Sequence, residues 1–352
     1  MTLETNLIKN ILEEKEIKNL SPYAAKSKFS KGRKKEETPC SIRTEFQRDR
    51  DRILHSKAFR RLKHKTQVFF APNDDHYRTR LTHTLEVAQV SRTIAKALNL
   101  NEDLVEAIAL GHDVGHTPFG HSGESVLDNI MQNGFNHNEN SVRVVSVIED
   151  LNLTDETLNG ILCHSYAWEP AYTLEGQIVQ IADKIAYINH DIDDSLRAGI
   201  IRIEDMPKDC IQYFSPRRQE RFSKMVYNLV ENSMDKDKIE MDEECVGYMN
   251  KLRSWMFENV YLNSVAKAEE DKAKRIIREL FEHYMYLLKI YAANYDEVKA
   301  QQTVCDYISG MTDTYIVQKY NQNFIPKSLA RFDDDGFLFR FAKLNGLTNV
   351  NE

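Results

Sequence analysis

The sequence predicts an all-α protein. Apolar residues recur at helical spacing through most of the 352-residue chain, and no regular alternation of strands and helices interrupts them. Hydrophobic residues make up 41% of the chain and charged residues 29%, which is typical of a globular protein. No run of 18 apolar residues occurs, so the sequence predicts no membrane span.

The chain is expected to open with a helix and a basic loop. Helical spacing of apolar residues predicts the helix over residues 4–20, and prolines and a glycine predict the loop over 21–41. An arginine-rich stretch predicts one or two short helices over 42–68. The Pro-Asn-Asp-Asp turn signal at 72–75 predicts a small hairpin over 69–79.

Amphipathic helices are expected through the rest of the chain. They are predicted over residues 80–98, 101–113, 124–131, 139–151, 155–164, 174–196, 216–234, 240–260, 263–293 and 297–324. Gly199 and Pro207 predict an irregular link over 197–213, and the polar stretch 333–352 is expected to fray.

The net charge of −7 is unevenly distributed along the chain. Residues 26–65 hold 15 Lys and Arg against 5 Asp and Glu, an excess of +10 that leaves −17 for the remainder. Such a block indicates an anionic partner, although for residues 26–35 alone a solvated face is the favoured interpretation. The five cysteines form no CxxC pair and the N-terminus carries no signal pattern, which predicts reduced thiols in a cytoplasmic protein.

The stretch 109–121 carries the strongest chemical signal. It places His112, Asp113, His116 and His121 within ten residues, at the end of an apolar helical segment. A buried His-Asp pair needs a partner, because unpaired polar groups are costly to bury, and a divalent metal ion suits both side chains. The glycines and the proline between them turn the chain sharply, which lets all three histidines approach one point.

His83 and Asp183 are the expected additional metal ligands. Each lies on a separate predicted helix, so that three helices converge on one ion, as in metal-binding helix bundles. Imidazole and carboxylate ligands suit Mn, Fe, Co, Ni or Zn, and suit Mg less well.

The order His83, His112-Asp113, Asp183 resembles the HD metal-dependent phosphohydrolase superfamily. Longer motifs resemble its deoxyguanosinetriphosphate triphosphohydrolase-like (dGTPase-like) family over roughly residues 40–320. These motifs lie at residues 43–53, 58–62, 67–69, 80–87, 111–124, 181–187 and 311–315. The resemblance implies hydrolysis of dGTP or several dNTPs to deoxynucleoside and inorganic triphosphate, by attack at the α-phosphorus.

The resemblance also implies an HD-domain helical bundle with additional C-terminal helices. We expect an N-terminal helix and basic loop over 1–40, an HD catalytic core over 41–215 and a C-terminal helical region packed on that core over 216–352. Aromatic C-terminal helices and the resemblance together predict a homo-oligomer, from dimer to hexamer. The resemblance further allows a dNTP or single-stranded DNA effector.

His121 and Glu124 are the expected acid-base pair. Glu124 lies three residues after His121 and can orient it at a helix start, with a simple helix-start charge as the alternative. His116 is expected to contact the phosphate or a leaving oxygen. His137 matches a further family histidine near the site, and a loop or cap histidine is its equally weighted alternative.

Five residues are expected to bind the substrate. Arg80 and Lys184 lie beside proposed metal ligands in the sequence and suit a multiply charged triphosphate. Tyr187 is expected to pack against the sugar, with a core tyrosine as the alternative. Asp191 and Gln67 are expected to hydrogen-bond the 3′-hydroxyl group.

Two other functions stay open at this point. Another HD enzyme, such as a nucleotidase, a phosphodiesterase or a nuclease, would share the four ligands. A non-enzymatic regulator would bind nucleotide or nucleic acid through the basic block, although it would not need an acid-base pair beside a metal. No phosphate-binding GxxxxGK[ST] loop occurs. His164 and His190 are interpreted as structural.

Overall fold

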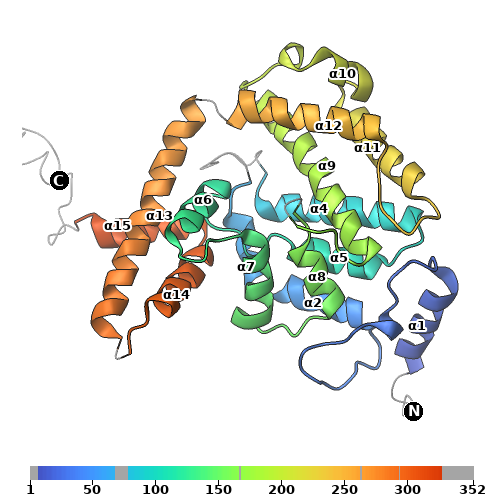
Figure 1. Ribbon diagram of the computed structural model, residues 1–352, viewed down its shortest axis with the longest axis horizontal. Helices are drawn as coiled ribbons and strands as arrows, with labels where there is room; N and C mark the ends of the chain where they lie inside the picture. Colours follow the sequence, from blue (N-terminus) through green and yellow to red (C-terminus); the bar gives the residue numbers. More distant parts are fainter. Residues whose placement is uncertain (1–6, 68–77, 166–167, 262–263, 293, 327–352) are drawn as a thin grey trace, which may run out of the picture. The chain divides into compact units, whose positions relative to one another are not determined.

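A computed structural model describes residues 7–67, 78–165, 168–261, 264–292 and 294–326. These residues form helices, α1 to α15 with short 3-10 and π segments, and no β-strand; two isolated bridges join Arg33 to Thr154 and Thr66 to Thr79. Figure 1 shows the helices in chain order. The predicted all-α class is confirmed.

Among the described residues up to 197, nine α-helices are present. They are α1 (Leu7–Asn19), α2 (Glu45–His55), α3 (Lys57–Arg61), α4 (Arg80–Ala97), α5 (Glu102–Gly111), α6 (His121–Ile130), α7 (His137–Arg143), α8 (Asp155–Leu162) and α9 (Leu174–Arg197). Six more follow, namely α10 (Lys208–Phe214), α11 (Arg218–Ser233), α12 (Glu243–Met256), α13 (Ser264–Tyr291), α14 (Glu297–Ser309) and α15 (Asp313–Phe324). Five-residue π-helices extend α7 and α12.

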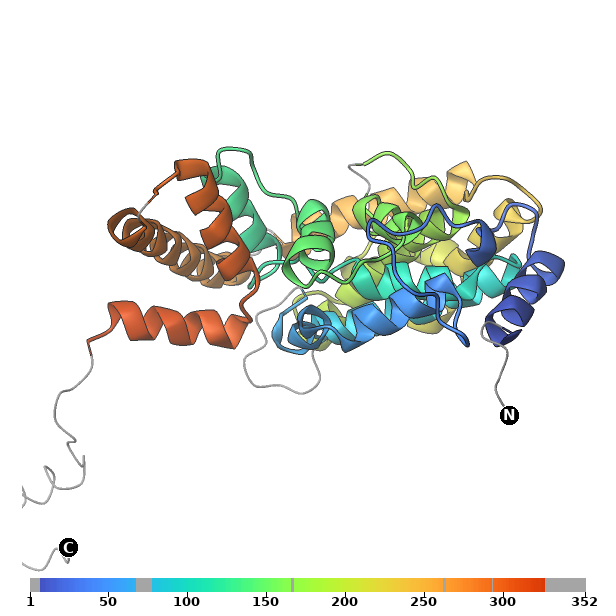
Figure 2. The same cartoon turned by 90° about the horizontal axis from the view of Figure 1, so that it is seen from below.

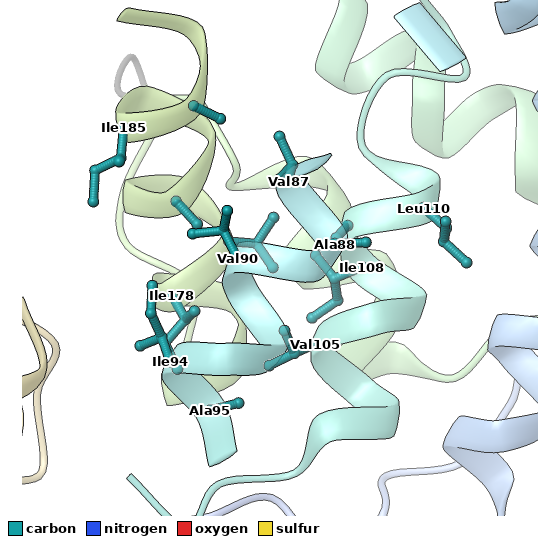
Figure 3. Close-up of a cluster of buried hydrophobic side chains, with 14 of the residues drawn as sticks. Val87, Ala88, Val90, Ile94, Ala95, Val105, Ile108, Leu110, Ile178 and Ile185 are labelled. Carbon is teal, nitrogen blue, oxygen red and sulfur yellow. The ribbon is translucent and has the colours of Figure 1, made fainter. Parts of the chain in front are cut away.

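Three mutually packed helices, α4, α5 and α9, form the centre of the core. Figure 2 shows the same helices from below, and Figure 3 shows their aliphatic side chains in contact across this junction. The most buried of the labelled residues, at most 2% exposed, are Val87, Val90, Ile94, Ala95, Val105, Ile108, Ile178 and Ile185. Burying each of the valine and isoleucine side chains stabilises the fold by about 1.5–3 kcal/mol, so the relative positions of these three helices are strongly determined.

Side-chain caps determine where these helices begin. Thr79 forms a capping box at the start of α4, Asn101 accepts two backbone N–H groups at the start of α5, and Thr173 caps α9. Asn136 caps α7, which makes His137 the first residue of that helix. The caps therefore set the positions of side chains near the helix starts.

Some elements differ from their predicted form. The link expected over 197–213 contains a 3-10 turn and α10, because Cys210 and Phe214, four residues apart, bury one helical face. The helix expected over 297–324 is two helices, separated at 310–312. The turn expected at 72–75 and the fraying stretch 333–352 lie outside the described residues.

The chain divides into two compact units, Met1–Ile316 and Val317–Glu352. The three-part organisation expected from the sequence stays a prediction. Among the described helices, none is both long enough and apolar enough to cross a membrane.

The basic block of residues 26–65 is partly compensated by carboxylates. Its ion-paired arginines are Arg33, Arg43, Arg48, Arg50, Arg52 and Arg61. Some of their carboxylate partners lie outside the block, as Asp103 does for Arg50 at 2.7 Å. The excess of +10 therefore overstates the charge that this region presents to solvent.

A close approach at Gly115 brings α7 against the turn that follows α5. The Gly115 N–H group donates to Ser141 Oγ at 2.9 Å, and the Asn140 side chain donates to the Gly115 carbonyl at 2.6 Å. A Cβ atom at Gly115 would lie 2.1 Å from the Ser141 backbone nitrogen. Only glycine permits this contact, which places His137 beside the turn.

We therefore expect Gly115→Ala to destabilise the protein by at least about 1–3 kcal/mol, the usual cost of overpacking. Gly247→Ala is the matched control, because Gly247 lies in α12 and a Cβ atom there would meet no other atom within 4 Å. This control should be more stable than wild type by about 1 kcal/mol, because alanine has a higher helix propensity than glycine. Denaturant unfolding followed by circular dichroism measures both variants. Equal stability of the two variants would contradict the close approach.

Candidate metal and acid-base site

Four side chains from the three central helices meet at one point. His83 comes from α4, His112 and Asp113 follow the end of α5, and Asp183 comes from α9. His83 Nε2 lies 2.9 Å from Asp183 Oδ1, and His112 Nε2 lies 3.8 Å from the same oxygen and 3.5 Å from Asp113 Oδ2. The structure thus brings together all four residues that the sequence suggested as metal ligands.

The donor atoms of this group fit a divalent metal ion. His112 Nδ1 lies 2.7 Å from the Ala109 carbonyl oxygen, which only accepts, so Nδ1 carries the hydrogen and Nε2 carries the lone pair. That Nε2 is buried and has no hydrogen-bond partner among the described residues. Ligand atoms of His83, His112 and Asp113 all lie within 4.8 Å of one another. An orphaned imidazole nitrogen beside two carboxylates is a typical metal-binding set.

Asp113 is a buried carboxylate held in its ionised form. Burial raises the pKa of Asp113, but electrostatic interactions with His112 and with the Arg80 guanidinium outweigh burial and keep that pKa well below its ordinary value. Arg80 Nη1 lies 2.8 Å from Asp113 Oδ2, and Arg80 is 2% exposed. Burial also raises the pKa of Asp183, and the hydrogen bond from His83 reverses the shift and lowers the pKa to about 2.

A second group is built around Glu124. One of its oxygens lies 3.2 Å from His121 Nδ1, and the other lies 2.7 Å from His137 Nδ1 and accepts the His137 backbone N–H at 2.9 Å. Burial raises the pKa of Glu124, but these two histidines outweigh burial and hold the pKa far below its usual range. The structure brings His121 and Glu124 together as the sequence suggested and adds His137 as a second partner of the same carboxylate.

His121 differs from its partners because its side chain is 79% exposed. It borders an open cavity of about 500 Å³. The cavity is lined mainly by polar residues of α6, α7 and the loop between them, namely His121, Glu124, Ser125, Asp128, Asn133, Gly134, Phe135, Asn136 and Glu139, together with Trp168. A small molecule in this cavity therefore has direct access to the imidazole.

Ring contacts connect the two groups. The His164 ring lies 5.0 Å from the His112 ring, and His164 Nε2 lies 3.2 Å from His137 Nε2. The His137 ring stacks on His116 at 4.3 Å, and His116 Nε2 lies 3.9 Å from Asp113 Oδ1. His116 and His137 therefore stand between the metal ligands and Glu124.

His164 and His190 contact the candidate ligands, whereas the sequence pattern favours purely structural roles for both. His190 Nδ1 lies 3.4 Å from His83 Nδ1. His190 follows Asp183 by seven residues, which is two helical turns. This spacing could have predicted that both side chains lie on the same side of the helix. For His164 the local sequence offers no such signal, because its place depends on how α8 packs against α5 and α7.

The residues expected to bind substrate are placed in different environments. Arg80 pairs with Asp113, and the Lys184 ammonium group donates to Asn250 Oδ1 on α12 at 2.8 Å. Burial lowers the pKa of Lys184 to about 8. Asp191 is buried and Tyr187 is half-buried against the core. The buried Gln67 Oε1 has no hydrogen-bond partner within the described part of the chain.

A contact far apart in sequence holds the turn that carries His116. Asp313 Oδ1 accepts the Phe119 N–H at 2.9 Å, and Asp313 Oδ2 accepts the Thr66 N–H at 2.8 Å. Lys65 is buried and its ammonium group donates to the carbonyl groups of His116 and Ser309. Burial lowers the pKa of Lys65 to about 7. The sequence motif at 311–315 therefore includes an anchor for this turn, a role that the sequence alone does not reveal.

Comparison with known proteins identifies two domain families. The HD domain model matches residues 80–188, and the phosphohydrolase-associated domain model matches residues 239–322. Proteins named deoxyguanosinetriphosphate triphosphohydrolase-like protein match nearly the whole chain. The one from Caldanaerobacter subterraneus subsp. tengcongensis is 55% identical, covering 91% of this chain and 96% of its own. Those from Desulfatibacillum aliphaticivorans and Clostridium tetani are each 45% identical, covering 91% and 93% of this chain and 98% and 99% of their own.

Two carboxylates of the site should respond differently to removal. Asp113→Ala should lose the metal and also destabilise the fold by about 3–5 kcal/mol, because it leaves the buried Arg80 unpaired. Asp183→Ala should lose the metal with a smaller stability cost, because the Asp183 side chain is 24% exposed and no buried arginine pairs with it among the described residues. Metal content by mass spectrometry and thermal unfolding measure the two effects. Full metal content in either variant would contradict the ligand assignment.

Metal binding should weaken as the pH falls. Burial lowers the pKa of His83, but its hydrogen bond to Asp183 more than compensates and raises that pKa above 6.5. A ligand histidine must lose this proton, so the apparent Kd for Mn²⁺ should rise by up to about tenfold per pH unit below the raised pKa. Calorimetric titration between pH 8 and pH 6 tests this. A constant Kd across that range would contradict a role for His83 as a ligand.

Proposed function

The chain belongs to the deoxyguanosinetriphosphate triphosphohydrolase-like family and carries its HD domain, and from this premise we propose that it hydrolyses deoxynucleoside triphosphates in a metal-dependent reaction. The products are a deoxynucleoside and inorganic triphosphate, from dGTP or from several dNTPs. One observation carries the proposal. A buried set of candidate metal ligands is connected to an exposed histidine, His121, whose carboxylate partner Glu124 is ionised.

His83, His112, Asp113 and Asp183 would hold the ion. A divalent metal bound there supplies Lewis-acid polarisation of the α-phosphate and lowers the pKa of a bound water. The two imidazoles and two carboxylates favour Mn, Fe, Co, Ni or Zn over Mg. Arg80 keeps Asp113 ionised and oriented toward the site.

His121 is the proposed general acid or base. The reaction breaks the bond between the α-phosphorus and the 5′ oxygen of the sugar, and that oxygen must gain a proton as it leaves. His121 Nδ1 faces Glu124, so its Nε2 is available to the substrate, and the carboxylate stabilises the imidazolium form. His137 holds the second oxygen of Glu124, and we propose that His116 contacts the phosphate or the leaving oxygen.

Residues of α9 and its surroundings are the proposed substrate contacts. Tyr187 and Asp191 follow Asp183 at intervals of four residues on α9, which supports sugar contacts near the metal. Gln67, with its unpaired buried oxygen, is the proposed second partner of the 3′-hydroxyl group. Arg80 and Lys184 stay the proposed phosphate contacts, and substrate binding would require each to share or exchange its present partner.

We further propose a cytoplasmic homo-oligomer, from dimer to hexamer. Large side chains of α13 are exposed in the single chain, with Tyr286 at 62%, Ile290 at 51% and Tyr291 at 79%. All five cysteines are free thiols, which favours a reducing compartment. A dNTP or single-stranded DNA stays the proposed effector, since lysines of the basic block such as Lys34 are exposed.

Product analysis tests the function directly. The purified protein is incubated with each of the four dNTPs and their mixture, and with GTP, in the presence of Mn²⁺ or Mg²⁺, and ion-exchange chromatography resolves the products. Deoxynucleoside and triphosphate are expected. A nucleoside monophosphate would instead indicate another HD-type phosphohydrolase, a nucleotidase or phosphodiesterase. Absence of turnover would favour a nucleotide- or nucleic-acid-binding regulator.

His121→Ala should separate binding from chemistry. The variant should keep metal and nucleotide binding but lose about 100- to 10,000-fold in kcat, the usual contribution of general acid-base catalysis. His55→Ala is the matched control, since His55 is an exposed histidine at the end of α2 and should leave kcat unchanged. A His121→Ala variant with normal kcat would contradict the acid-base assignment.

A further inference from the structure

The metal ligand His83 makes its second hydrogen bond to another histidine. His83 Nε2 faces Asp183, and the opposite ring nitrogen, Nδ1, lies 3.4 Å from His190 Nδ1. Both rings are at most 2% exposed, and they meet edge to face with centroids 5.6 Å apart at 88°. Water therefore has little access to this pair, and the hydrogen on one of the two Nδ1 atoms must serve the contact.

The contact of His190 with Glu86 determines which of the two Nδ1 atoms carries that hydrogen. Its Oε2 lies 3.1 Å from His190 Nε2, and a carboxylate only accepts hydrogen bonds. His190 Nε2 must then carry a hydrogen, so neutral His190 presents a lone pair at Nδ1. His83 Nδ1 must in turn be the donor. When His83 gives up the Nε2 hydrogen that it shares with Asp183, its lone pair therefore lies on Nε2, the nitrogen that faces the other candidate ligands.

Two arginines hold Glu86 in this orientation. Arg78 Nε lies 3.0 Å from Glu86 Oε2, and Arg218 Nη2 lies 3.4 Å from Glu86 Oε1. Arg78 is also anchored by Asp194 at 2.6 Å, on the same helix as His190. Since Glu86 and His83 are three residues apart on α4, they share one face of that helix. The chain of contacts therefore begins in a fixed network at the surface and ends at the metal site.

We propose that Glu86 and His190 are positioning residues that fix the tautomer and ring orientation of His83, and thereby raise the affinity of the site for a divalent ion. Such partners of ligand histidines typically contribute 10- to 100-fold in metal affinity. The inference rests on the proposed metal centre and adds to it two residues that do not themselves bind the ion.

Substitutions of His190 separate the tautomer role from packing. His190→Phe keeps an aromatic ring but removes the acceptor, so the Kd of the metal-stripped full-length protein for Mn²⁺ should rise about 10- to 100-fold. His190→Gln offers an amide oxygen to His83 and an amide N–H to Glu86, and its Kd should stay within about threefold of wild type. Electron paramagnetic resonance of free Mn²⁺ measures each Kd without activity.

Two further variants keep the test independent of folding. Asn189→Ala removes the buried partner of Arg221 on another face of α9, so it destabilises the same helix but should leave the Kd unchanged. Glu86 is 36% exposed, so Glu86→Leu should fold and weaken Mn²⁺ binding several-fold, whereas Glu86→Gln can still accept from His190 and should bind nearly as wild type.

Three results would overturn the positioning role while leaving the metal centre intact. The first is normal Mn²⁺ affinity in both His190→Phe and Glu86→Leu. The second is a Kd for Mn²⁺ that rises equally in His190→Gln and His190→Phe. The third is a Kd that rises equally in Asn189→Ala and His190→Phe. A wild-type protein that binds no Mn²⁺ would overturn the metal centre itself and this inference with it.

Discussion

The burial of one carboxylate, that of Asp113, is the constraint on which the rest of the site depends. A charge removed from water must be compensated nearby, and Asp113 finds Arg80 at 2.8 Å and the imidazoles of His112 and His116 within 4 Å. These partners come from the start of α4, the end of α5 and the following turn. The aliphatic core between α4, α5 and α9 is what brings them to the same point (Figure 3).

The site combines a buried half and an exposed half, which suits different tasks. The candidate ligands His83 and His112 are 1% exposed, in an environment where charges interact strongly, whereas the His121 side chain is 79% exposed beside the cavity. Glu124, His137 and His116 lie between these halves. Asp313, from the far end of the sequence, and Lys65, which also contacts Ser309, hold the intervening turn, so the geometry of the candidate site depends on the C-terminal helices as well as on the HD domain.

Local sequence was sufficient to predict most of the helices, because helical periodicity is a short-range signal. The clustered His-Asp motif likewise pointed to His112 and Asp113, and the structure brings His83 and Asp183 to the same place. Local sequence was insufficient for contacts set by helix packing. His164 reaches His112 only because α8 packs against α5, and Lys184 faces Asn250 because α12 packs against α9. The charge count over residues 26–65 also overstated the positive charge that this region presents to solvent. It could not reveal that Arg50 pairs with Asp103 and Arg61 with Glu149.

The central claim is that water attacks the α-phosphorus of a dNTP at this site. A reaction run in ¹⁸O-labelled water and analysed by mass spectrometry tests it most directly. We expect one ¹⁸O atom in the released triphosphate and none in the 5′-hydroxyl group of the deoxynucleoside. Label in the deoxynucleoside, or in a monophosphate product, would contradict that claim.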